Sequence, residues 1–324
     1  MSETETDNWP VRTGSGAPEP EALRDIMALV AAAFDTDGNP PLSEQTLVEL
    51  ASPAAEADAL LTLLAYAPEE KSDPSTGQDL AGLAVVSPVG GSGVLEIVVH
   101  PNYRNQGVGT LLVDKLKANR GLAGIKAWSH GDHEAAADLA ARYGYVAVRE
   151  LWRMRLIRTH GSDQALPEAV LPPGVTLRTF MPGQDEHAWL AANAAAFAHH
   201  PEQGSMTLSD LQARMTERWF DPAGFFLATD AEGTILGFHW TKVHPETGHH
   251  PSLGEVYVVG VTPQAQGSGL GRTLSTAGIR YLQGRGLSAI MLYVDADNQA
   301  AVSLYRSLGF TRWDADVMYG PRPE

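Results

Sequence analysis

The sequence contains no cysteine, and this absence removes several kinds of chemistry at once. Disulfides, thiolate metal sites and a cysteine nucleophile are all excluded. Proteins of the reducing cytoplasm carry no structural disulfides, so a chain without cysteine fits that compartment. We therefore expect a cytoplasmic protein.

Basic residues are scarce as well. The chain has 23 Lys and Arg against 39 Asp and Glu, a formal net charge of −16. Nucleic-acid binding needs a broad basic face and a polybasic membrane contact needs clustered cations, so the charge argues against both partners. Residues 1–16, MSETETDNWPVRTGSG, lack the pattern of a signal peptide, and the longest mostly apolar run, ADALLTLLAYA, is too short to span a bilayer. We expect a globular monomer.

Two glycine-rich turns divide the chain into similar halves. Residues 96–112 read EIVVHPNYRNQGVGTLL and residues 258–274 read VVGVTPQAQGSGLGRTL. Aligning Pro101 with Pro263 brings the turns into register at a separation of 162 residues. Each turn follows an apolar, strand-like run and precedes a helix-like one.

The pattern of elements is also the same in both halves. Apolar periodicity and turn residues predict the order β-α-α-β-β-β, glycine turn, α-β-α-β in each, and Thr207 and Asp210 stand at capping-box spacing before one of the helices. The polar, proline-rich stretch RTHGSDQALPEAVLPPG between the halves reads as a linker. We predict an α/β (α+β) fold of two tandem domains, each a mixed, mostly antiparallel sheet flanked by helices, with residues 1–158 as the first domain, 159–173 as the linker and 174–324 as the second domain.

Glycine turns of this kind suit a phosphate. A helix N-terminus exposes unpaired N–H groups and the positive end of the helix dipole, and glycine lets a phosphate approach them closely. A simple tight turn is the alternative. Neither turn has the Gly-Lys-Ser/Thr of a P-loop, and GSGLG has the wrong spacing for a dinucleotide fingerprint.

The pattern Gln/Arg-x-x-Gly-x-Gly after a buried strand resembles the pyrophosphate loop of the GCN5-related N-acetyltransferases, or GNAT proteins. The later stretch DNQAAVSLYRSLGF and the order of elements match this family too. The resemblance implies two tandem GNAT acyltransferase domains with acetyl-CoA as co-substrate. In the second half the implied acetyl-CoA contacts are Val259, Gly260, Val261, Gln266, Gly267, Ser268, Gly269, Leu270, Gly271, Arg272 and Asn298. In the first half, a second, non-reacting acetyl-CoA would contact Ile97, Val98, Val99, Arg104, Asn105, Gln106, Gly107, Val108, Gly109 and Thr110.

Acetyl transfer to an amine needs a base for the ammonium proton and an acid for the departing thiolate. Glu255 stands at the head of the strand EVYVVGV, and Tyr305 lies where the family commonly places its acid. By the repeat register Glu255 falls on Gly93 and Tyr305 on Ala140, so the first half lacks both groups. We expect a catalytic second domain and a catalytically degenerate first one, in which Glu96 is a weaker candidate for a substitute base.

Longer stretches of the second half resemble the mycothiol synthases, a family of tandem acetyltransferases from actinobacteria. They are AAFAHHPEQG, GFHWTKVHP, GEVYVVGV and LYVDADNQAAVSLYRSLGF. The resemblance implies a small thiol-amine substrate, the cysteinyl amine of a glucosaminyl-inositol conjugate. The implied substrate residues are Glu202, Lys242, Glu255 and Tyr293, with Glu44 reaching in from the first domain.

Two other functions remain open. One is an acetyltransferase for another amine, such as a protein N-terminus or an antibiotic, and the other is a non-catalytic sensor that binds acetyl-CoA without turnover. The histidines His199, His200, His244, His249 and His250 lack metal-site spacing, so we expect no metal and interpret them as loop residues.

Overall fold

The computed structural model describes residues 9–51, 60–68, 70–71, 79–89, 92–157, 166, 168–199, 203–247 and 251–322. The chain forms two compact units. Unit 1 comprises Met1–Glu150 together with Ala315–Glu324, and unit 2 comprises Leu151–Asp314. Most of the predicted linker, residues 159–165 and 167, lies outside the described residues.

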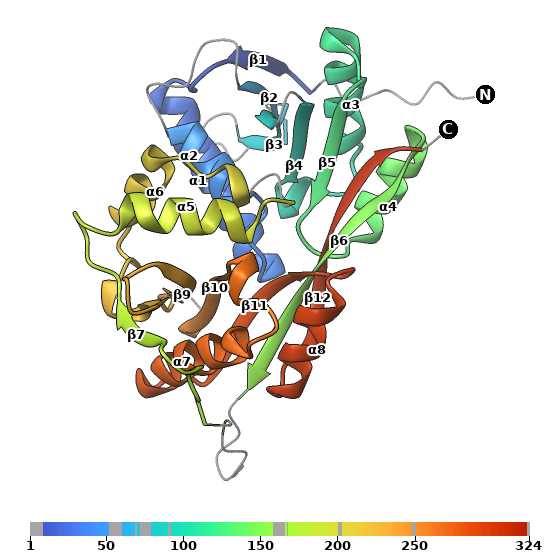
Figure 1. The fold of residues 1–324 in the computed structure, drawn as a ribbon. Helices are drawn as coiled ribbons and strands as arrows, with labels where there is room; N and C mark the ends of the chain where they lie inside the picture. The colour runs from blue at the N-terminus through green and yellow to red at the C-terminus, as the bar shows by residue number, and fades with distance from the viewer. Residues whose placement is uncertain are drawn as a thin grey trace. The chain divides into compact units, whose positions relative to one another are not determined.

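Unit 1 follows the predicted order of elements (Figure 1). Its helices are α1 (Pro20–Asp37), α2 (Glu44–Ala51), α3 (Val108–Arg120) and α4 (Glu134–Arg142), and its strands are β1 (Val11–Ser15), β2 (Leu61–Tyr66), β3 (Leu80–Val89), β4 (Ser92–Val99), β5 (Ile125–Ser129) and the first part of β6 (Tyr145–Ile157). Strands β1 to β4 are antiparallel neighbours in that order, and β5 runs parallel to β4.

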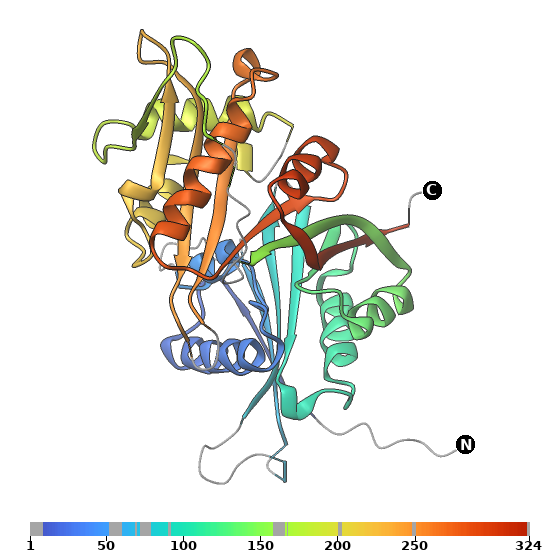
Figure 2. The same ribbon diagram turned by 90° about the horizontal axis from the view of Figure 1, so that it is seen from below.

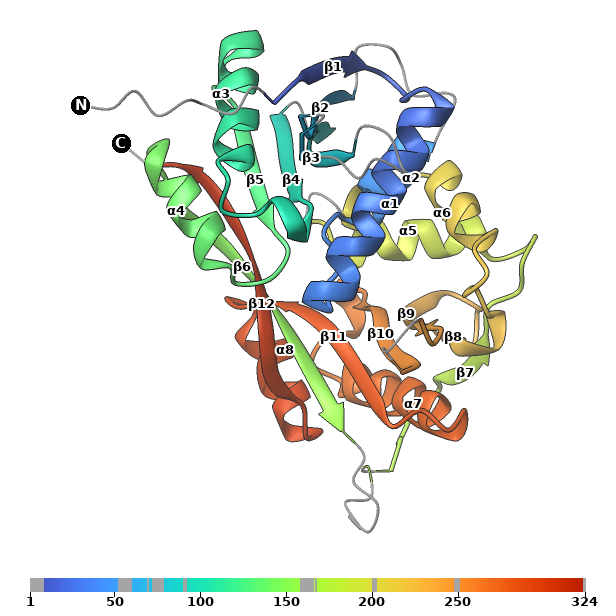
Figure 3. The same cartoon turned by 180° about the vertical axis from the view of Figure 1, so that it is seen from behind.

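Helices cover both faces of the unit 1 sheet, with α1 and α2 on one side and α3 on the other (Figure 3). The alternation of buried side chains along the strands feeds two cores. Leu83, Val85 and Val98 face α1 and α2, where Ile26 and Leu29 are buried. On the other face, side chains from β2 to β5 pack against Val108, Leu112 and Leu116 of α3.

Unit 2 repeats the same order. Its helices are α5 (Glu186–Ala196), α6 (Leu208–Met215), α7 (Leu270–Gly284) and α8 (Gln299–Ser307), and its strands are β7 (Thr176–Thr179), β8 (Phe225–Thr229), β9 (Ile235–His244), β10 (Leu253–Val261), β11 (Ala289–Asp295) and the first part of β12 (Thr311–Pro321). Strands β7 to β10 are antiparallel neighbours, and β11 runs parallel to β10. The capping box of Thr207 and Asp210 is present at the start of α6, as predicted.

The unit 2 sheet also has a core on each face, and Figure 2 shows α7 running along its strands. Four aromatic rings are buried under α5 and α6: Trp189, Phe225, Phe238 and Trp240. Phe225 stacks on Trp240 with ring centroids 4.6 Å apart, and Trp189 meets the other three rings edge-on at 5.4 Å, 5.5 Å and 5.7 Å. Such contacts add to the burial of a large apolar area. On the opposite face, α7 and α8 pack on β10 and β11.

The unit boundaries differ from the predicted ones because two long strands each serve both units. Residues Leu151–Ile157 of β6 pair antiparallel with β11 in unit 2. Residues Val317–Tyr319 of β12 pair antiparallel with β5 in unit 1. β6 has 13 residues and β12 has 11, so each strand is long enough to contribute strand pairing to both units. Linker composition alone carries no sign of this exchange.

The predicted fold class is confirmed, since each unit is a mixed, mostly antiparallel sheet flanked by helices. Among the helices that the structure describes, none combines the length and the apolar character needed to cross a membrane.

Candidate active site

In both units, two parallel strands separate beside the glycine turn. β10 pairs with β11 only from Gly254 to Val256, although β10 continues to Val261. β4 pairs with β5 only from Gly93 to Glu96, although β4 continues to Val99. Beyond these points the strand pair opens into a wedge that ends at the glycine turn. A ligand that binds there can reach both faces of the sheet.

The two glycine turns have the same backbone conformation. Gly107 has φ 84° and Gly269 has φ 83°, and each caps the helix that follows. One turn places Asn105 (φ 60°) where the other places Gly267 (φ 78°), and Asn105 is the one non-glycine residue of positive φ among those described. The left-handed conformation bends the chain so that the first N–H groups of α3 and α7 point out of the turn.

Equivalent side chains connect each turn to the strand that precedes it. Arg104 Nε donates to Val99 O over 3.2 Å, and Gln266 Nε2 donates to Val261 O over 3.3 Å. Arg104 also forms a bidentate pair with Asp37, with both N–O distances 2.7 Å. A guanidinium held in this way fixes the turn and reduces the charge it offers to a phosphate.

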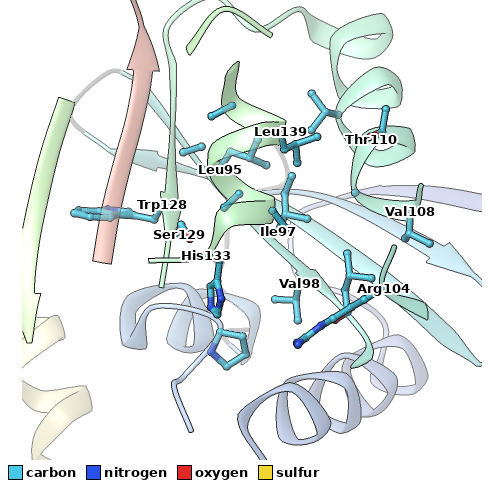
Figure 4. A pocket seen from close by; sticks show the side chains of 18 of the residues that line it. Leu95, Ile97, Val98, Arg104, Val108, Thr110, Trp128, Ser129, His133 and Leu139 are labelled. Carbon is cyan, nitrogen blue, oxygen red and sulfur yellow. The ribbon is translucent and has the colours of Figure 1, made fainter. Parts of the chain in front are cut away.

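Unit 1 contains a cavity of about 470 Å³ in its wedge. Its walls come from β4, β5, α3 and α4, and Figure 4 shows Ile97, Leu139 and Val108 around it, with Arg104 and His133 at its edge. Of the predicted acetyl-CoA residues of the first half, all but Gln106 line this cavity: Ile97, Val98, Val99, Arg104, Asn105, Gly107, Val108, Gly109 and Thr110.

In unit 2, Glu255 lies on β10 with a side chain that is only 7% exposed. His244, the last residue of β9, donates from Nε2 to Glu255 Oε2 over 2.6 Å. Burial favours the neutral carboxyl, but the hydrogen bond from His244 and the cations Lys242 and Arg153 outweigh it. The pKa of the Glu255 carboxyl is therefore below its usual value, and this group is an ionised acceptor at neutral pH.

Two predicted substrate residues lie near this carboxylate. Lys242 pairs with Glu255 across β9 and β10, and its ammonium lies 4.5 Å from the ring centroid of Trp219 and 5.1 Å from that of Tyr257. Tyr293 of β11 stands beside Arg153 of β6, whose guanidinium is 5.8 Å from the Tyr293 ring. The structure thus brings a carboxylate, two cations and aromatic rings to one face of unit 2.

Tyr305 lies on the other face of the same sheet. It is 7% exposed and packs under α8 with Val256, Leu292 and Phe310. Burial raises the pKa of its phenol to about 12, and the Ser275 hydroxyl acts in the opposite direction. The phenol keeps its proton throughout the neutral range and has the protonation state required of an acid.

The pairing corrects the predicted register of Glu255. Gly254 and Gly93 both open the parallel pairing, which gives a separation of 161 residues before a bulge in β10 between Val256 and Val258. After the bulge the separation is 162. Glu255 therefore corresponds to Val94 and not to Gly93. The first unit still has no carboxylate at that position. Ala140 occupies the position in α4 that Tyr305 occupies in α8.

Glu96 is part of a closed hydrogen-bond network in unit 1. Its buried carboxylate accepts from Ser43 N over 2.7 Å, from Thr46 Oγ1 and from His130 Nε2. His130 Nδ1 contacts Asp316 Oδ2 at 3.1 Å. Burial opposes the charged imidazole, yet its two carboxylate partners raise the pKa of His130 to about 9. A carboxylate held by donors at both oxygens is a poor proton acceptor, and this geometry argues against Glu96 as a substitute base.

The remaining predicted residues are placed as follows. Glu44 begins α2 in unit 1, and Glu202 lies outside the described residues. Asn298 caps α8, with its Oδ1 accepting from Ala301 N over 3.1 Å. Of the histidines, His200, His249 and His250 lie outside the described residues and His199 is in a turn. His244 is not a loop residue: it ends β9 and contacts Glu255. The described residues contain no group of three or more His, Asp or Glu able to hold a metal ion.

The chain matches models of one family in both halves. Residues 189–310 match the Acetyltransferase (GNAT) family and residues 69–147 match the Acetyltransferase (GNAT) domain. A protein of Arthrobacter sp. (strain FB24) named "Mycothiol acetyltransferase" is 65% identical over 323 residues, which is 99% of each chain. Another of that name, from Paenarthrobacter aurescens (strain TC1), is 63% identical over 99% of each chain. The chain belongs to the mycothiol acetyltransferase family.

Membership of this GNAT family makes the chain an enzyme, an N-acetyltransferase with acetyl-CoA as co-substrate. Solved structures agree on the fold. A GCN5-related N-acetyltransferase from Sphaerobacter thermophilus superposes with TM-score 0.62 and 26% identity over 96% of each chain. A tandem GNAT protein from the clavulanic acid biosynthesis pathway superposes with TM-score 0.68 and 18% identity, covering 97% of this chain and all of the other.

Proposed function

We propose that unit 2 transfers the acetyl group of acetyl-CoA to the cysteinyl amine of cysteinyl-glucosaminyl-inositol (desacetylmycothiol) and so makes mycothiol. The name shared by the full-length relatives supports this substrate. The polar face of unit 2 supports it as well, since an ammonium favours the Glu255 carboxylate and a polyol needs hydrogen-bonding groups such as Lys242 and Tyr293. Glu44 and Glu202 complete the proposed substrate residues.

One observation carries the proposed mechanism. Glu255 and Tyr305 lie on opposite faces of the unit 2 sheet, one on each side of the wedge where β10 and β11 stop pairing. A thioester within the wedge would expose its carbonyl carbon to an amine on the Glu255 face and its sulfur to the phenol on the other. This arrangement would allow Glu255 to remove a proton from the amine and Tyr305 to donate a proton to the sulfur.

The proposed reaction is a direct transfer. Glu255, through water, takes one proton from the ammonium, and the amine nitrogen then attacks the thioester carbonyl. A backbone N–H of Val259, Gly260 or Val261 stabilises the oxyanion. The C–S bond breaks as Tyr305 protonates the thiolate. Of the two protons left on the nitrogen, one restores the phenol and the other stays on the amide. The helix N-terminus after Gln266–Gly269, together with Leu270, Gly271, Arg272 and Asn298, would hold the co-substrate.

We propose that unit 1 binds acetyl-CoA without transferring its acetyl group. The cavity supports binding, because it lies in the wedge and ends at the glycine turn that Arg104 and Gln106 flank. Ala140 in place of the tyrosine and the fixed carboxylate of Glu96 support the lack of transfer. We further propose a cytoplasmic monomer that uses no metal.

Mass spectrometry of the reaction tests the function directly. The purified protein is mixed with acetyl-CoA and cysteinyl-glucosaminyl-inositol, and the product is expected to gain one acetyl group on its amine. Glu255→Gln and Tyr305→Phe are each expected to lower turnover about 10²–10⁴-fold while acetyl-CoA still binds. No acetylated product from the wild-type protein would contradict the substrate, and full turnover in both variants would contradict the assigned roles.

A further inference from the structure

Acetylation of an ammonium releases a proton that must reach solvent. The reactants are an ammonium and a thioester, and the products are an amide, a thiol and one free proton. In the proposed function Glu255 takes that proton. Its side chain is only 7% exposed, so a protonated Glu255 needs a partner that carries the proton away before the next turnover.

Three basic side chains influence the charge of Glu255: His244, Lys242 and Arg153. A lysine ammonium and an arginine guanidinium are donors with no lone pair to accept a proton. Imidazole differs, since it can accept a proton at one nitrogen and release one from the other. Among these three neighbours, His244 is therefore the one suited to take a proton from the carboxyl.

The position of His244 fits this task. Its Nε2 lies 2.6 Å from Glu255 Oε2, within direct transfer distance. Its side chain is 36% exposed, about five times the exposed fraction of the carboxylate side chain that it contacts. His244 also ends β9, so the ring stands at the edge of the strand pairing. It thus connects a buried carboxylate to solvent.

We propose that His244 is the proton relay of the active site, acting through Glu255. This inference rests on the proposed function of unit 2. In the tautomer with its proton on Nδ1, His244 accepts at Nε2: the O–H bond of the protonated Glu255 carboxyl breaks as an N–H bond forms at Nε2. The imidazolium then loses its Nδ1 proton to a solvent base, which leaves the Nε2–H that donates to the Glu255 carboxylate. Before the next transfer the partly exposed ring gains a proton from solvent at Nδ1 and gives its Nε2 proton to solvent, so the accepting tautomer returns with no net change in protons. His244 is a positioning and relay residue, with no contact to the reacting atoms required.

Chemical rescue distinguishes a relay from a structural hydrogen bond. His244→Ala removes the proton carrier, and His244→Gln keeps a side-chain donor toward Glu255 but cannot carry a proton. We expect kcat to fall about 10²-fold in both, the lower end of the usual scale of acid–base groups, with the KM for acetyl-CoA unchanged. Added imidazole, at constant pH and ionic strength, should raise kcat of His244→Ala in proportion to its concentration. His187→Ala, an exposed histidine on α5, is the matched control and should behave as the wild type with and without imidazole.

Each other outcome overturns the relay. A His244→Gln variant with wild-type kcat would show that His244 acts only as a hydrogen-bond donor. A slow His244→Ala variant that imidazole does not accelerate would show a structural role. The wild-type protein in the same assay separates the two proposals. If the wild type acetylates the substrate and a His244 variant gives either of these contrary results, the relay alone is wrong. If the wild type does not acetylate the substrate, the proposed function is wrong and the relay with it.

Discussion

His244 and Glu255 are diagonal neighbours across β9 and β10, with Nε2 and Oε2 2.6 Å apart. Directly across the strand pair, Glu255 faces Lys242 and His244 faces Leu253. Diagonal pairs on one face of an antiparallel ladder remain within reach of long side chains. The register of this one hairpin therefore decides which carboxylate is buried, which cation faces it and which imidazole touches it.

The acid limb of kcat/KM should report this pair. In the wild type, the lowered pKa of Glu255 keeps the carboxylate ionised at every pH well above 4.5, the ordinary value. His244→Ala removes both a hydrogen bond and a charge that favour the ionised form, so the pKa rises and the acid limb moves to higher pH. Rates measured from pH 4 to pH 8 test this. His187→Ala should leave the limb in place, and an unmoved limb in His244→Ala would show that the pair does not control the carboxylate.

The phenol of Tyr305 should impose no basic limb in the neutral range. With a pKa of about 12, it remains protonated to beyond pH 10. Tyr305→Phe is expected to lower kcat about 10²–10⁴-fold and to change thermal stability little, because the buried ring is kept. Tyr281→Phe on α7, which loses only its contacts to Asp221 and Arg285, should retain wild-type kcat. Equal kcat values for Tyr305→Phe and Tyr281→Phe would remove Tyr305 from the mechanism.

Local features of the chain could be predicted well. The strand before each glycine turn, the turn itself and the helix that carries Tyr305 all follow from short stretches of sequence. Such stretches fix periodicity, capping and turn conformation without any long-range information. Because the same order of strands and helices occurs in both halves, the fold class could be predicted from the sequence.

Features set by register could not be predicted. The bulge in β10 between Val256 and Val258 cannot be recognised from the composition of the strand. It nevertheless makes Val94, and not Gly93, the residue of unit 1 that corresponds to Glu255. His244 is the first residue of a loop-like stretch, HPETGHH, so the sequence favours a loop residue there. Its role appears only when β9 is paired with β10. The exchange of β6 and β12 between the units is a long-range pairing of the same kind.

The two glycine turns should be separable by mutation. Gly107→Ala and Gly269→Ala each force alanine into the left-handed region, a cost of about 1–2 kcal/mol that shifts the turn. Calorimetric titration of the wild type should give two acetyl-CoA per chain. Gly107→Ala should weaken one of these sites without changing the KM of the reaction, and Gly269→Ala should raise that KM. A raised KM from Gly107→Ala alone would place catalysis in unit 1.

The network of His130, Glu96 and Asp316 should make the stability of unit 1 depend on pH. The folded pKa of His130, about 9, exceeds the ordinary 6.5, so the imidazolium stabilises fully below pH 6.5 and this contribution is lost as pH rises to 9. The difference amounts to a contribution on the order of 3 kcal/mol. The lowered pKa of Glu96 acts at the other end, with its contribution present above 4.5 and lost as pH falls below it.

Hydrogen exchange resolved by peptide can measure this loss within unit 1. Peptides of β4 and β5 should lose protection between pH 6.5 and pH 9 after correction for the intrinsic rate, while peptides of β8 and β9 in unit 2 serve as an internal reference. His130→Ala should lower protection at pH 6.5, because it leaves two buried carboxylates without their shared cation, and should flatten the profile up to pH 9. His187→Ala should keep the wild-type slope. If wild-type β4 and β5 lose no protection over this interval, the imidazolium does not stabilise unit 1, and Glu96 must be held by Ser43 and Thr46 alone.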